Sequence, residues 1–267
     1  MMLTAQTPIA QPKVKGLIAH PRPELRCGIP AGIKKIIAVH SGKGGVGKTF
    51  VAVNLAALLA KKGHAIGLLD ADIDCPNVMK MLQLKGKLIA DNNRKIIPLQ
   101  KFGIKVVSMA PMLDSEDEVL MWRGPIVSRV VEQFLFDVAW NSLDFLIVDL
   151  PPGTSDIPLT LFQMVREAKL LLVSTPQELA LLDAKKSINM AKRLHVDIIG
   201  IMENMTGPVF GSGVTKKLAF SLQIPFLGSI PLEKRYAIPF NKGMPHILTS
   251  SQLQKSFERI IKKIKNI

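Results

Sequence analysis

The 267-residue chain has little cysteine, few aromatic residues and no long apolar run. Its two cysteines, Cys27 and Cys75, are far apart in the sequence, which excludes a disulfide scaffold and a metal site built from one local cysteine cluster. No apolar stretch reaches the roughly 18 residues of a transmembrane helix. The first residues also lack the contiguous apolar block of a secretory signal. We therefore expect a cytoplasmic protein.

Acidic residues are scarce relative to basic ones, since 35 Lys and Arg oppose 21 Asp and Glu and give a formal net charge of +14. The excess is concentrated at the ends: residues 1–40 carry a net +5 and residues 251–267 a net +4. A basic balance predicts an anionic partner, and a nucleotide, DNA and an anionic membrane surface are the candidates. Aromatic residues make up 5% of the chain, which argues against stacking on single-stranded nucleic acid.

Short apolar runs alternate with helical patterns from Lys34 onward. Seven runs are expected to be strands: Ile36 to Val39, Ala65 to Leu69, Lys105 to Met109, Phe145 to Leu150, Leu170 to Ser174, Asp197 to Met202 and Pro225 to Ile230. Helical patterns cover Lys48 to Lys62, Glu116 to Val138, Glu178 to Leu194 and Thr215 to Leu222. Apolar strands without polar alternation are typical of a parallel sheet. We predict an α/β fold, doubly wound, with a mostly parallel sheet of about seven or eight strands flanked by helices.

A glycine-rich loop follows the first predicted strand and precedes a helix. Residues Gly42 to Thr49 match the Gly-x-x-x-x-Gly-Lys-Ser/Thr pattern of a phosphate-binding P-loop. Backbone N–H groups of such a loop surround phosphate oxygens, and this role is expected for Gly42, Lys43, Gly44, Gly45, Val46 and Gly47. Lys48 is expected to reach the β- and γ-phosphates and Thr49 to hold Mg²⁺.

Lys43 adds a second cation inside this loop. It is either a solvated loop residue or a catalytic group that reaches the nucleotide of a neighbouring subunit and stabilises charge on the γ-phosphate. The second role predicts a homodimer that encloses the nucleotide.

Carboxylates follow two other predicted strands. Asp70, Asp72 and Asp74 stand at alternate positions, and like charges so close repel one another unless a cation or its water separates them. Asp72 is expected to orient the attacking water, with Asp70 and Asp74 as structural or magnesium-coupled neighbours. Asp74 alternatively caps a helix that begins near Pro76. Asp149 follows four apolar residues in the manner of a Walker B carboxylate, which predicts that it holds Mg²⁺ through a water beside Thr49.

Together these residues resemble the deviant Walker A family of P-loop ATPases, which includes MinD, ParA and the nitrogenase iron protein. Within that family, about residues 33–248 are similar to the Mrp/ApbC iron–sulfur cluster carriers. The closer likeness is carried by Asp70 to Pro76, Trp122 to Pro125, Asp149 to Gly153, Thr175 to Glu178, Leu182 to Ala184 and Glu203 to Met205. The resemblance implies a slow, dimer-dependent ATPase in which Asn204 contacts adenine, although Asn204 alternatively only forms a turn. No Asn-Lys-x-Asp guanine signature follows a predicted strand, so ATP is preferred to GTP.

One departure concerns the [4Fe-4S] cluster that the resemblance implies. The carriers place a Cys-x-x-Cys shortly after the Glu-Asn-Met element, whereas residues 205–211 contain no cysteine here. The resemblance to the carriers implies that the chain binds a cluster. The missing cysteines argue against it, because iron–sulfur clusters ordinarily need four thiolates. Cys27 and Cys75, doubled in a dimer, supply four thiolates in principle; alternatively, they are simple buried or surface cysteines without a cluster.

We therefore expect an Mg²⁺-dependent ATPase of the Mrp type in iron–sulfur cluster assembly or carriage, with assembly proteins or apo-protein clients as partners. The alternative is a MinD/ParA-like positioning ATPase that cycles on a membrane or DNA surface. Three segments are expected: a flexible basic leader over residues 1–33, a P-loop ATPase domain over 34–250, and an amphipathic basic helix over 251–267. The apolar face of that helix either packs on the sheet or enters an anionic membrane interface.

Overall fold

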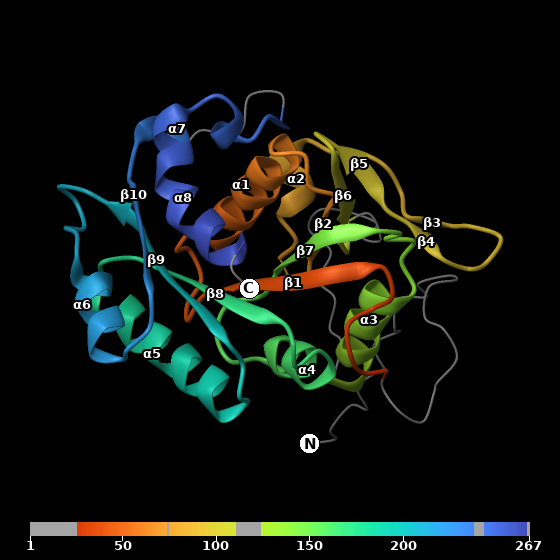
Figure 1. The fold of residues 1–267 in the computed structure, drawn as a ribbon, viewed down its shortest axis with the longest axis horizontal. Helices are drawn as coiled ribbons and strands as arrows, with labels where there is room; N and C mark the ends of the chain where they lie inside the picture. Colours follow the sequence, from red (N-terminus) through yellow and green to blue (C-terminus); the bar gives the residue numbers. More distant parts are fainter. Residues whose placement is uncertain (1–25, 74, 111–123, 238–242, 266–267) are drawn as a thin grey trace, which may run out of the picture.

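An eight-stranded sheet forms the centre of the chain, with the strand order β10-β9-β8-β1-β7-β2-β6-β5 (Figure 1). The computed structural model describes residues 26–73, 75–110, 124–237 and 243–265. All neighbouring strands are parallel except β5, which runs antiparallel to β6. The strands are β1 Ile33–His40, β2 Ile66–Asp70, β5 Leu99–Lys101, β6 Ile104–Val107, β7 Leu143–Asp149, β8 Lys169–Ser174, β9 Ile198–Thr206 and β10 Phe226–Pro231. This arrangement confirms the predicted fold class.

All seven predicted strands are present, within a few residues of the expected bounds. β5 was not among the predicted strands, nor was a separate antiparallel pair formed by β3 Ile89–Ala90 and β4 Ile96–Ile97. These elements have two or three residues each, which is too short to show a periodic pattern.

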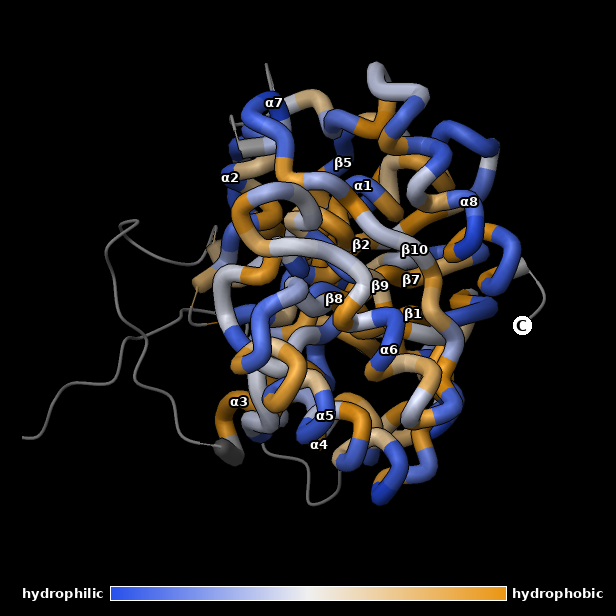
Figure 2. The backbone as a smooth tube through the Cα atoms, turned by 90° about the vertical axis from the view of Figure 1, so that its left-hand side faces the viewer, coloured by the Kyte–Doolittle hydropathy of each residue, from blue (hydrophilic) through white to orange (hydrophobic). Residues whose placement is uncertain are grey.

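Helices cover both faces of the sheet, as Figure 1 shows. One face carries α3 Gly124–Phe136, α4 Asp156–Met164, α5 Glu178–Arg193 and α6 Val214–Ser221. The other carries α1 Lys48–Lys61, α2 Val78–Leu82, α7 Lys234–Ala237, the 3₁₀ helix η3 His246–Leu248 and α8 Ser251–Lys265. Hydrophobic stretches gather around the central strands and hydrophilic ones lie outside (Figure 2). The doubly wound topology brings the ends of β1, β2, β7 and β9 to one edge.

Three helix predictions are confirmed and one is tested only in part. The helices α1, α5 and α6 begin and end within a residue of the expected bounds. The fourth was expected over Glu116 to Val138; the structure describes α3 from Gly124, and residues 111–123 lie outside the described part. The short helix α2 begins two residues after the start expected near Pro76, whereas the short helices α4 and α7 were not anticipated.

The C-terminal helix α8 packs its apolar face into the core. Leu253, Phe257, Ile260 and Ile264 are fully buried, and they join the same hydrophobic cluster as α1. Lys255, Arg259, Lys262 and Lys263 are exposed. Burial of this face against the sheet is the first of the two alternatives that the sequence left open.

Part of the expected flexible leader is fixed to the domain. The Arg26 guanidinium lies 2.7 Å from the Asp137 carboxylate and 3.0 Å from Glu132, and it covers the ring of Phe136. The backbone N–H of Gly28 donates to the carbonyl of Met164. The expectation of a loose segment up to residue 33 is therefore wrong for residues 26–32, because these contacts attach them; residues 1–25 lie outside the described part.

Candidate functional site

The glycine-rich loop connects β1 to α1 and is held by groups from two other strand ends. Asn204 Nδ2, at the end of β9, donates to the Val46 carbonyl at 2.8 Å. The N–H of Gly153 donates to the Ser41 carbonyl at 2.8 Å. A Cβ at Gly42 would overlap the backbone of Asp183, and Gly47 adopts a φ of +82°, so both positions require glycine.

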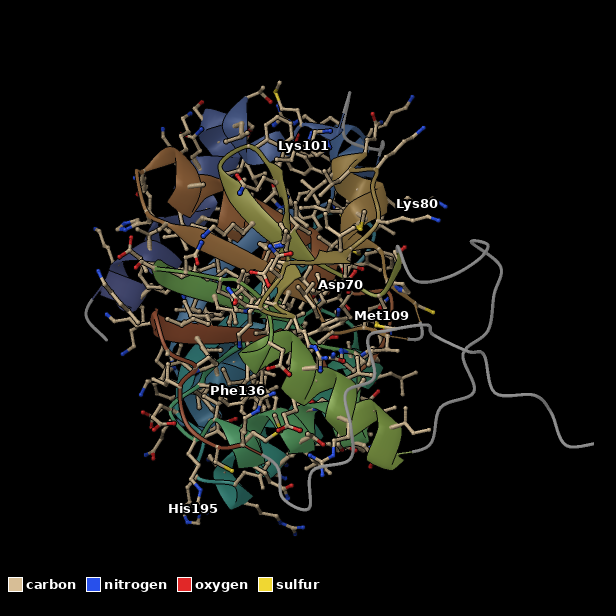
Figure 3. The ribbon with its side chains drawn as sticks, turned by 90° about the vertical axis from the view of Figure 1, so that its right-hand side faces the viewer. Asp70, Lys80, Lys101, Met109, Phe136 and His195 are labelled. Atoms are coloured by element: carbon tan, nitrogen blue, oxygen red, sulfur yellow. The ribbon has the colours of Figure 1, made fainter. Side chains whose placement is uncertain are left out.

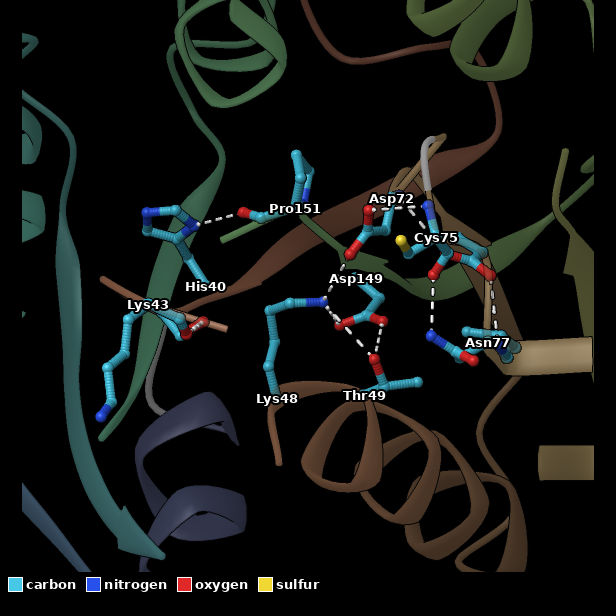
Figure 4. A network of polar contacts seen from close by, with 12 residues as sticks. His40, Lys43, Lys48, Thr49, Asp72, Cys75, Asn77, Asp149 and Pro151 are labelled. Carbon is cyan, nitrogen blue, oxygen red and sulfur yellow. Dashed lines mark hydrogen bonds and ion pairs between the residues drawn. The ribbon is translucent and has the colours of Figure 1, made fainter. Parts of the chain in front are cut away.

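Lys48, Thr49 and Asp149 converge at the mouth of this loop (Figure 4). Lys48 Nζ lies 2.9 Å from Asp149 Oδ1, and Thr49 Oγ1 donates to Asp149 Oδ2 at 2.7 Å. The Asp149 side chain is completely buried, which raises its pKa, while Lys48 and Thr49 stabilise its charged form by hydrogen bonding. The structure thus brings together a P-loop lysine, a hydroxyl and a Walker B carboxylate, as the sequence predicted.

Asp72 lies on the other side of Lys48. Its Oδ2 is 3.8 Å from Lys48 Nζ, and its Oδ1 accepts a hydrogen bond from the N–H of Cys75 at 3.3 Å. The Asp72 side chain is 13% exposed, so solvent reaches its carboxylate. Solvent does not reach Asp149, whose side chain is 0% exposed. A carboxylate that water reaches, beside the lysine, has the chemistry needed to orient a water molecule.

Asp70, in contrast to Asp72, is enclosed by protein groups that bond to its carboxylate. It is fully buried, and its two oxygens accept hydrogen bonds from Ser108 Oγ and from the N–H groups of Asp72 and Val78. Burial first, and then the negative charge of Asp149, raise its pKa to about 8. Figure 3 shows Lys80 reaching the edge of the molecule while Asp70 lies further in. Asp70 therefore fixes the first turn of α2, and Asp74, the residue expected to cap that helix, lies outside the described residues.

Lys43 points away from Lys48 and Asp149 (Figure 4). Its Nζ donates to Gln177 Oε1, at the start of α5, with a distance of 3.1 Å. The side chain is thus held at the rim of the loop and does not enter the site formed by its own chain.

Two buried side chains of β9 connect the loop to α6. Asn204 is 4% exposed and bonds to the P-loop, as described above. Its neighbour Glu203 is buried, and its carboxylate accepts hydrogen bonds from the N–H groups of Gly213 and Thr215, at the start of α6. In the sequence, Glu203 stands out only as part of the Glu203 to Met205 segment that is similar to the carriers. A single acid in an otherwise apolar strand is the signal that could have indicated its contact with α6.

His40 is a site residue that the sequence analysis missed. It is the last residue of β1, fully buried, and its Nδ1 lies 3.1 Å from the carbonyl oxygen of Pro151. Burial and the nearby charge of Lys48 lower its pKa to about 4, although the carbonyls of Pro151 and Gly153 act in the opposite direction. A titratable residue that ends an apolar strand directly before a P-loop was the available signal.

The oxygen donors present suit Mg²⁺. Thr49 and Asp149 offer a hydroxyl and a carboxylate, the hard ligands that this cation takes together with substrate phosphates. Among the described residues, no three His, Cys, Asp or Glu side chains gather as a metal site of their own.

The thiols do not suit an iron–sulfur cluster. Cys27 and Cys75 are both exposed. Cys27 precedes β1 and lies by Met164, at the amino end of the sheet, whereas Cys75 follows β2 at its carboxyl end. At the position expected for Cys-x-x-Cys, Gly207 and Gly211 exchange two backbone hydrogen bonds and close a tight turn without a thiol. One chain therefore cannot bring two cysteine ligands to one cluster in this arrangement.

Comparisons with known proteins agree with this geometry. A sequence model of the ParA family, described as NUBPL iron-transfer P-loop NTPase, matches residues 32–265. A protein from Aquifex aeolicus named iron-sulfur cluster carrier protein is 40% identical over 249 residues, which cover 88% of this chain and 68% of the relative. A protein of the same name from Methanocaldococcus jannaschii is 41% identical over 265 residues, 95% of this chain and 91% of the relative.

Solved structures show the same fold. A nucleotide-binding protein from Archaeoglobus fulgidus in complex with ADP is 36% identical, with a TM-score of 0.66 over 77% of this chain and 85% of that one. The cell division ATPase MinD of Pyrococcus furiosus is 21% identical, with a TM-score of 0.68 over 87% of this chain and 98% of that one, a likeness of fold alone. In the part of the chain that the structure describes, no helix is long and apolar enough to cross a membrane.

Proposed function

Because the chain belongs to the ParA family of NUBPL-type iron-transfer P-loop NTPases, we propose that it hydrolyses Mg²⁺-ATP and acts in iron–sulfur cluster assembly or carriage. The observation that carries the nucleotide part is the convergence of Lys48, Thr49 and Asp149 at the mouth of the glycine-rich loop. The cluster part is supported by relatives about 40% identical that are named iron-sulfur cluster carrier proteins.

Each site residue has a proposed part in hydrolysis. The loop from Gly42 to Gly47 binds phosphate oxygens with its N–H groups, and Lys48 leaves Asp149 to contact the β- and γ-phosphates. Thr49 and Asp149 hold Mg²⁺, which supplies charge neutralisation on the phosphates when bound. Asp72 orients the attacking water and accepts its proton. Asn204 contacts the adenine base from the end of β9.

A homodimer completes the site in this proposal. Lys43 stands at the rim and is directed away from its own Lys48, which suits a cation that acts on the nucleotide of a second copy. Release from Gln177 would accompany dimer formation. Turnover per chain is then expected to rise with protein concentration.

The cluster is proposed as cargo that this chain does not ligate alone. Iron–sulfur clusters require several thiolates, and the two cysteines lie at opposite ends of the sheet. We infer that an assembly protein or apo-protein client supplies thiolates when a cluster is transferred. The role of this chain is then to bind and release that partner as ATP is hydrolysed.

The positioning alternative receives no support from α8. A membrane-binding helix must present its apolar face to lipid, and here the same face fills the core with Phe257 and Ile260. No observation on the described residues favours DNA as the partner.

Anaerobic purification tests the two parts separately. ATP turnover with and without Mg²⁺ measures the enzymatic part, and its absence in folded protein at high concentration would overturn it. Reconstitution with iron and sulfide, followed by visible spectroscopy and iron analysis, measures the cluster part. We expect no stable cluster on the chain alone, and a cluster only after a thiol-bearing partner is added; a stable cluster on the isolated dimer would contradict this assignment of ligands.

A further inference from the structure

The loop that follows Asp149 carries two successive prolines beside the P-loop. Pro151 and Pro152 have no N–H group, so neither residue can donate to the neighbouring strand. The parallel pairing of β1 with β7 ends at Val39 and Asp149. Beyond that pair the backbone needs another donor to keep the two segments attached.

Three consecutive residues directly before the P-loop nonetheless bond to this loop. The carbonyl of Val39 accepts a hydrogen bond from the N–H of Leu150 at 3.0 Å. The carbonyl of Ser41 accepts one from the N–H of Gly153 at 2.8 Å. Between them, the imidazole of His40 bonds to the carbonyl of Pro151 at 3.1 Å. The side chain thus continues a connection that the backbone cannot make across the prolines.

The chemistry of this contact defines which nitrogen carries the proton. A carbonyl oxygen only accepts, so Nδ1 of His40 is the donor. The other ring nitrogen, Nε2, is buried and forms no hydrogen bond with the described residues. Only one of the two polar atoms of the ring is therefore used, and it serves the loop after Asp149.

We propose that His40 is a positioning residue, which fastens the loop Leu150–Gly153 to the P-loop so that the two move as one unit when nucleotide is bound or hydrolysed. The loop directly follows Asp149, the proposed Mg²⁺ residue, and Gly153 is bonded to Ser41, the residue directly before the P-loop. A change at the γ-phosphate would therefore be transmitted to both segments through His40. The effect on turnover rests on the proposed ATPase function, whereas the attachment itself does not.

Amide hydrogen exchange of the nucleotide-free protein tests the attachment. In His40→Leu, which keeps a large buried side chain without a donor, exchange at Leu150 and Gly153 is expected to be at least about tenfold faster than in the unmodified protein. In His40→Asn, whose Nδ2 takes the place of Nδ1, exchange is expected to stay within about threefold. Ser174→Ala is the matched control, because it alters a buried residue at the end of the neighbouring strand β8 whose hydroxyl bonds to the carbonyls of Thr175 and Ala180.

Two further measurements keep the outcome decisive. His40→Gln places its side-chain nitrogen near the Nε2 position. If the contact with Pro151 holds the loop, its amide exchange should be as fast as in His40→Leu; if a polar side chain is sufficient, its exchange should be as slow as in His40→Asn. In the unmodified protein, ¹⁵N shifts of His40 should show a neutral ring protonated on Nδ1. Unchanged exchange in both His40→Leu and His40→Gln, or a proton on Nε2, would overturn the proposal. Absence of ATP turnover in the unmodified protein would instead overturn the proposed function and leave the exchange result to decide on His40.

If the protein hydrolyses ATP, the variants also separate positioning from a merely structural role. His40→Leu should lower kcat at least about tenfold with KM changed less than about threefold, and His40→Asn should restore kcat. Equal losses in His40→Leu and His40→Asn would show that the Pro151 contact has no part in turnover.

Discussion

Lys48 Nζ and Asp149 Oδ1 form an ion pair of 2.9 Å in which both side chains are buried. Each group lies in a region of low dielectric constant and depends on the other for neutralisation of its charge. The same lysine is the one proposed to contact phosphate, so nucleotide binding would exchange one anionic partner for another.

Replacement of Lys48 by Met should destabilise the nucleotide-free protein. Removal of one partner leaves the Asp149 carboxylate without compensation, which typically costs ~3–5 kcal/mol in the free energy of unfolding. Urea denaturation of both proteins measures this difference. Lys34→Met is the control, because Lys34 is 73% exposed in its pair with Asp144 and an exposed pair contributes ~0–1 kcal/mol. Equal stability of Lys48→Met and the unmodified protein would refute the role of the buried pair.

Asp72→Asn should abolish hydrolysis without loss of nucleotide binding. Asparagine keeps the size of the side chain but cannot accept the proton of the attacking water, and such losses reach ~10²–10⁴-fold in rate. Single-turnover kinetics and fluorescence titration with an ATP analogue separate the two effects. Asp156→Asn, an exposed acid in the first turn of α4, should leave both values unchanged. Retained turnover in Asp72→Asn would exclude this carboxylate as the base.

Lys43→Ala should remove the dependence of turnover on protein concentration. In the dimer the lysine acts on the second nucleotide, and the loss of such a cation costs ~10³-fold or more in kcat. Gln177→Ala is the matched control, because it removes the hydrogen bond of Lys43 Nζ to Gln177 and leaves the charge in place. ATP turnover measured over a range of protein concentrations distinguishes them; full activity of Lys43→Ala would dismiss the role in the dimer.

Arg26→Met should lower stability more at neutral pH than in acid. Burial disfavours the charged form of Glu132, but hydrogen bonds from Arg129 and Arg26 outweigh it and lower the pKa of Glu132 below its usual 4.5. A carboxyl group whose pKa is lowered by folding stabilises the protein at pH values above its unfolded-state pKa. This stabilisation is lost as the pH falls through its folded-state pKa. Urea denaturation from about pH 7 to about pH 3.5 should therefore show the difference between Arg26→Met and the unmodified protein shrinking.

A control with an exposed pair makes this result specific. Lys186→Met alters an ion pair with Asp183 in which the lysine is 64% exposed, and it should change stability by less than ~1 kcal/mol at either pH. A difference for Arg26→Met that stays constant with pH would argue against the contribution of Glu132.

Phe257→Ala should test whether α8 is part of the core. The ring is fully buried, and deletion of such a side chain costs ~3–5 kcal/mol. Phe220→Ala offers a matched control, because Phe220 is 87% exposed on α6 and its loss should change stability by less than ~0.5 kcal/mol. Thermal unfolding measures both. Similar small effects for the two variants would mean that α8 is not packed as described.

The sequence predicted the central strands because buried parallel strands are apolar on both faces and leave a local pattern. It also predicted Lys48, Thr49 and Asp149 as neighbours, since the carboxyl ends of parallel strands share one edge. It did not predict β5, because three residues are too few to show the hydrophobic periodicity of a strand. Their extended conformation depends on pairing with β6.

Contacts between distant residues were the other part that could not be predicted. Arg26 finds its carboxylates 106 and 111 residues further along the chain, so a proline-containing segment with no periodicity turns out to be attached. Lys43 and Gln177 are 134 residues apart, and His40 and Pro151 are 111 apart. Such pairs depend on how the finished layers pack, and a single sequence holds no local signal for them.

The attachment of the glycine-rich loop by Asn204, Gly153 and Gln177 has a consequence for ligand affinity. A free loop with glycines at four positions would lose much conformational entropy when it closed around a ligand. Here part of that loss occurs when the chain folds, because Asn204 and Gly153 bond to the backbone carbonyls of Val46 and Ser41, and Gln177 holds the side chain of Lys43. The loop should therefore need little additional ordering when a triphosphate binds. The entropic cost of binding should then be small, and it should offset little of the favourable enthalpy of the phosphate contacts.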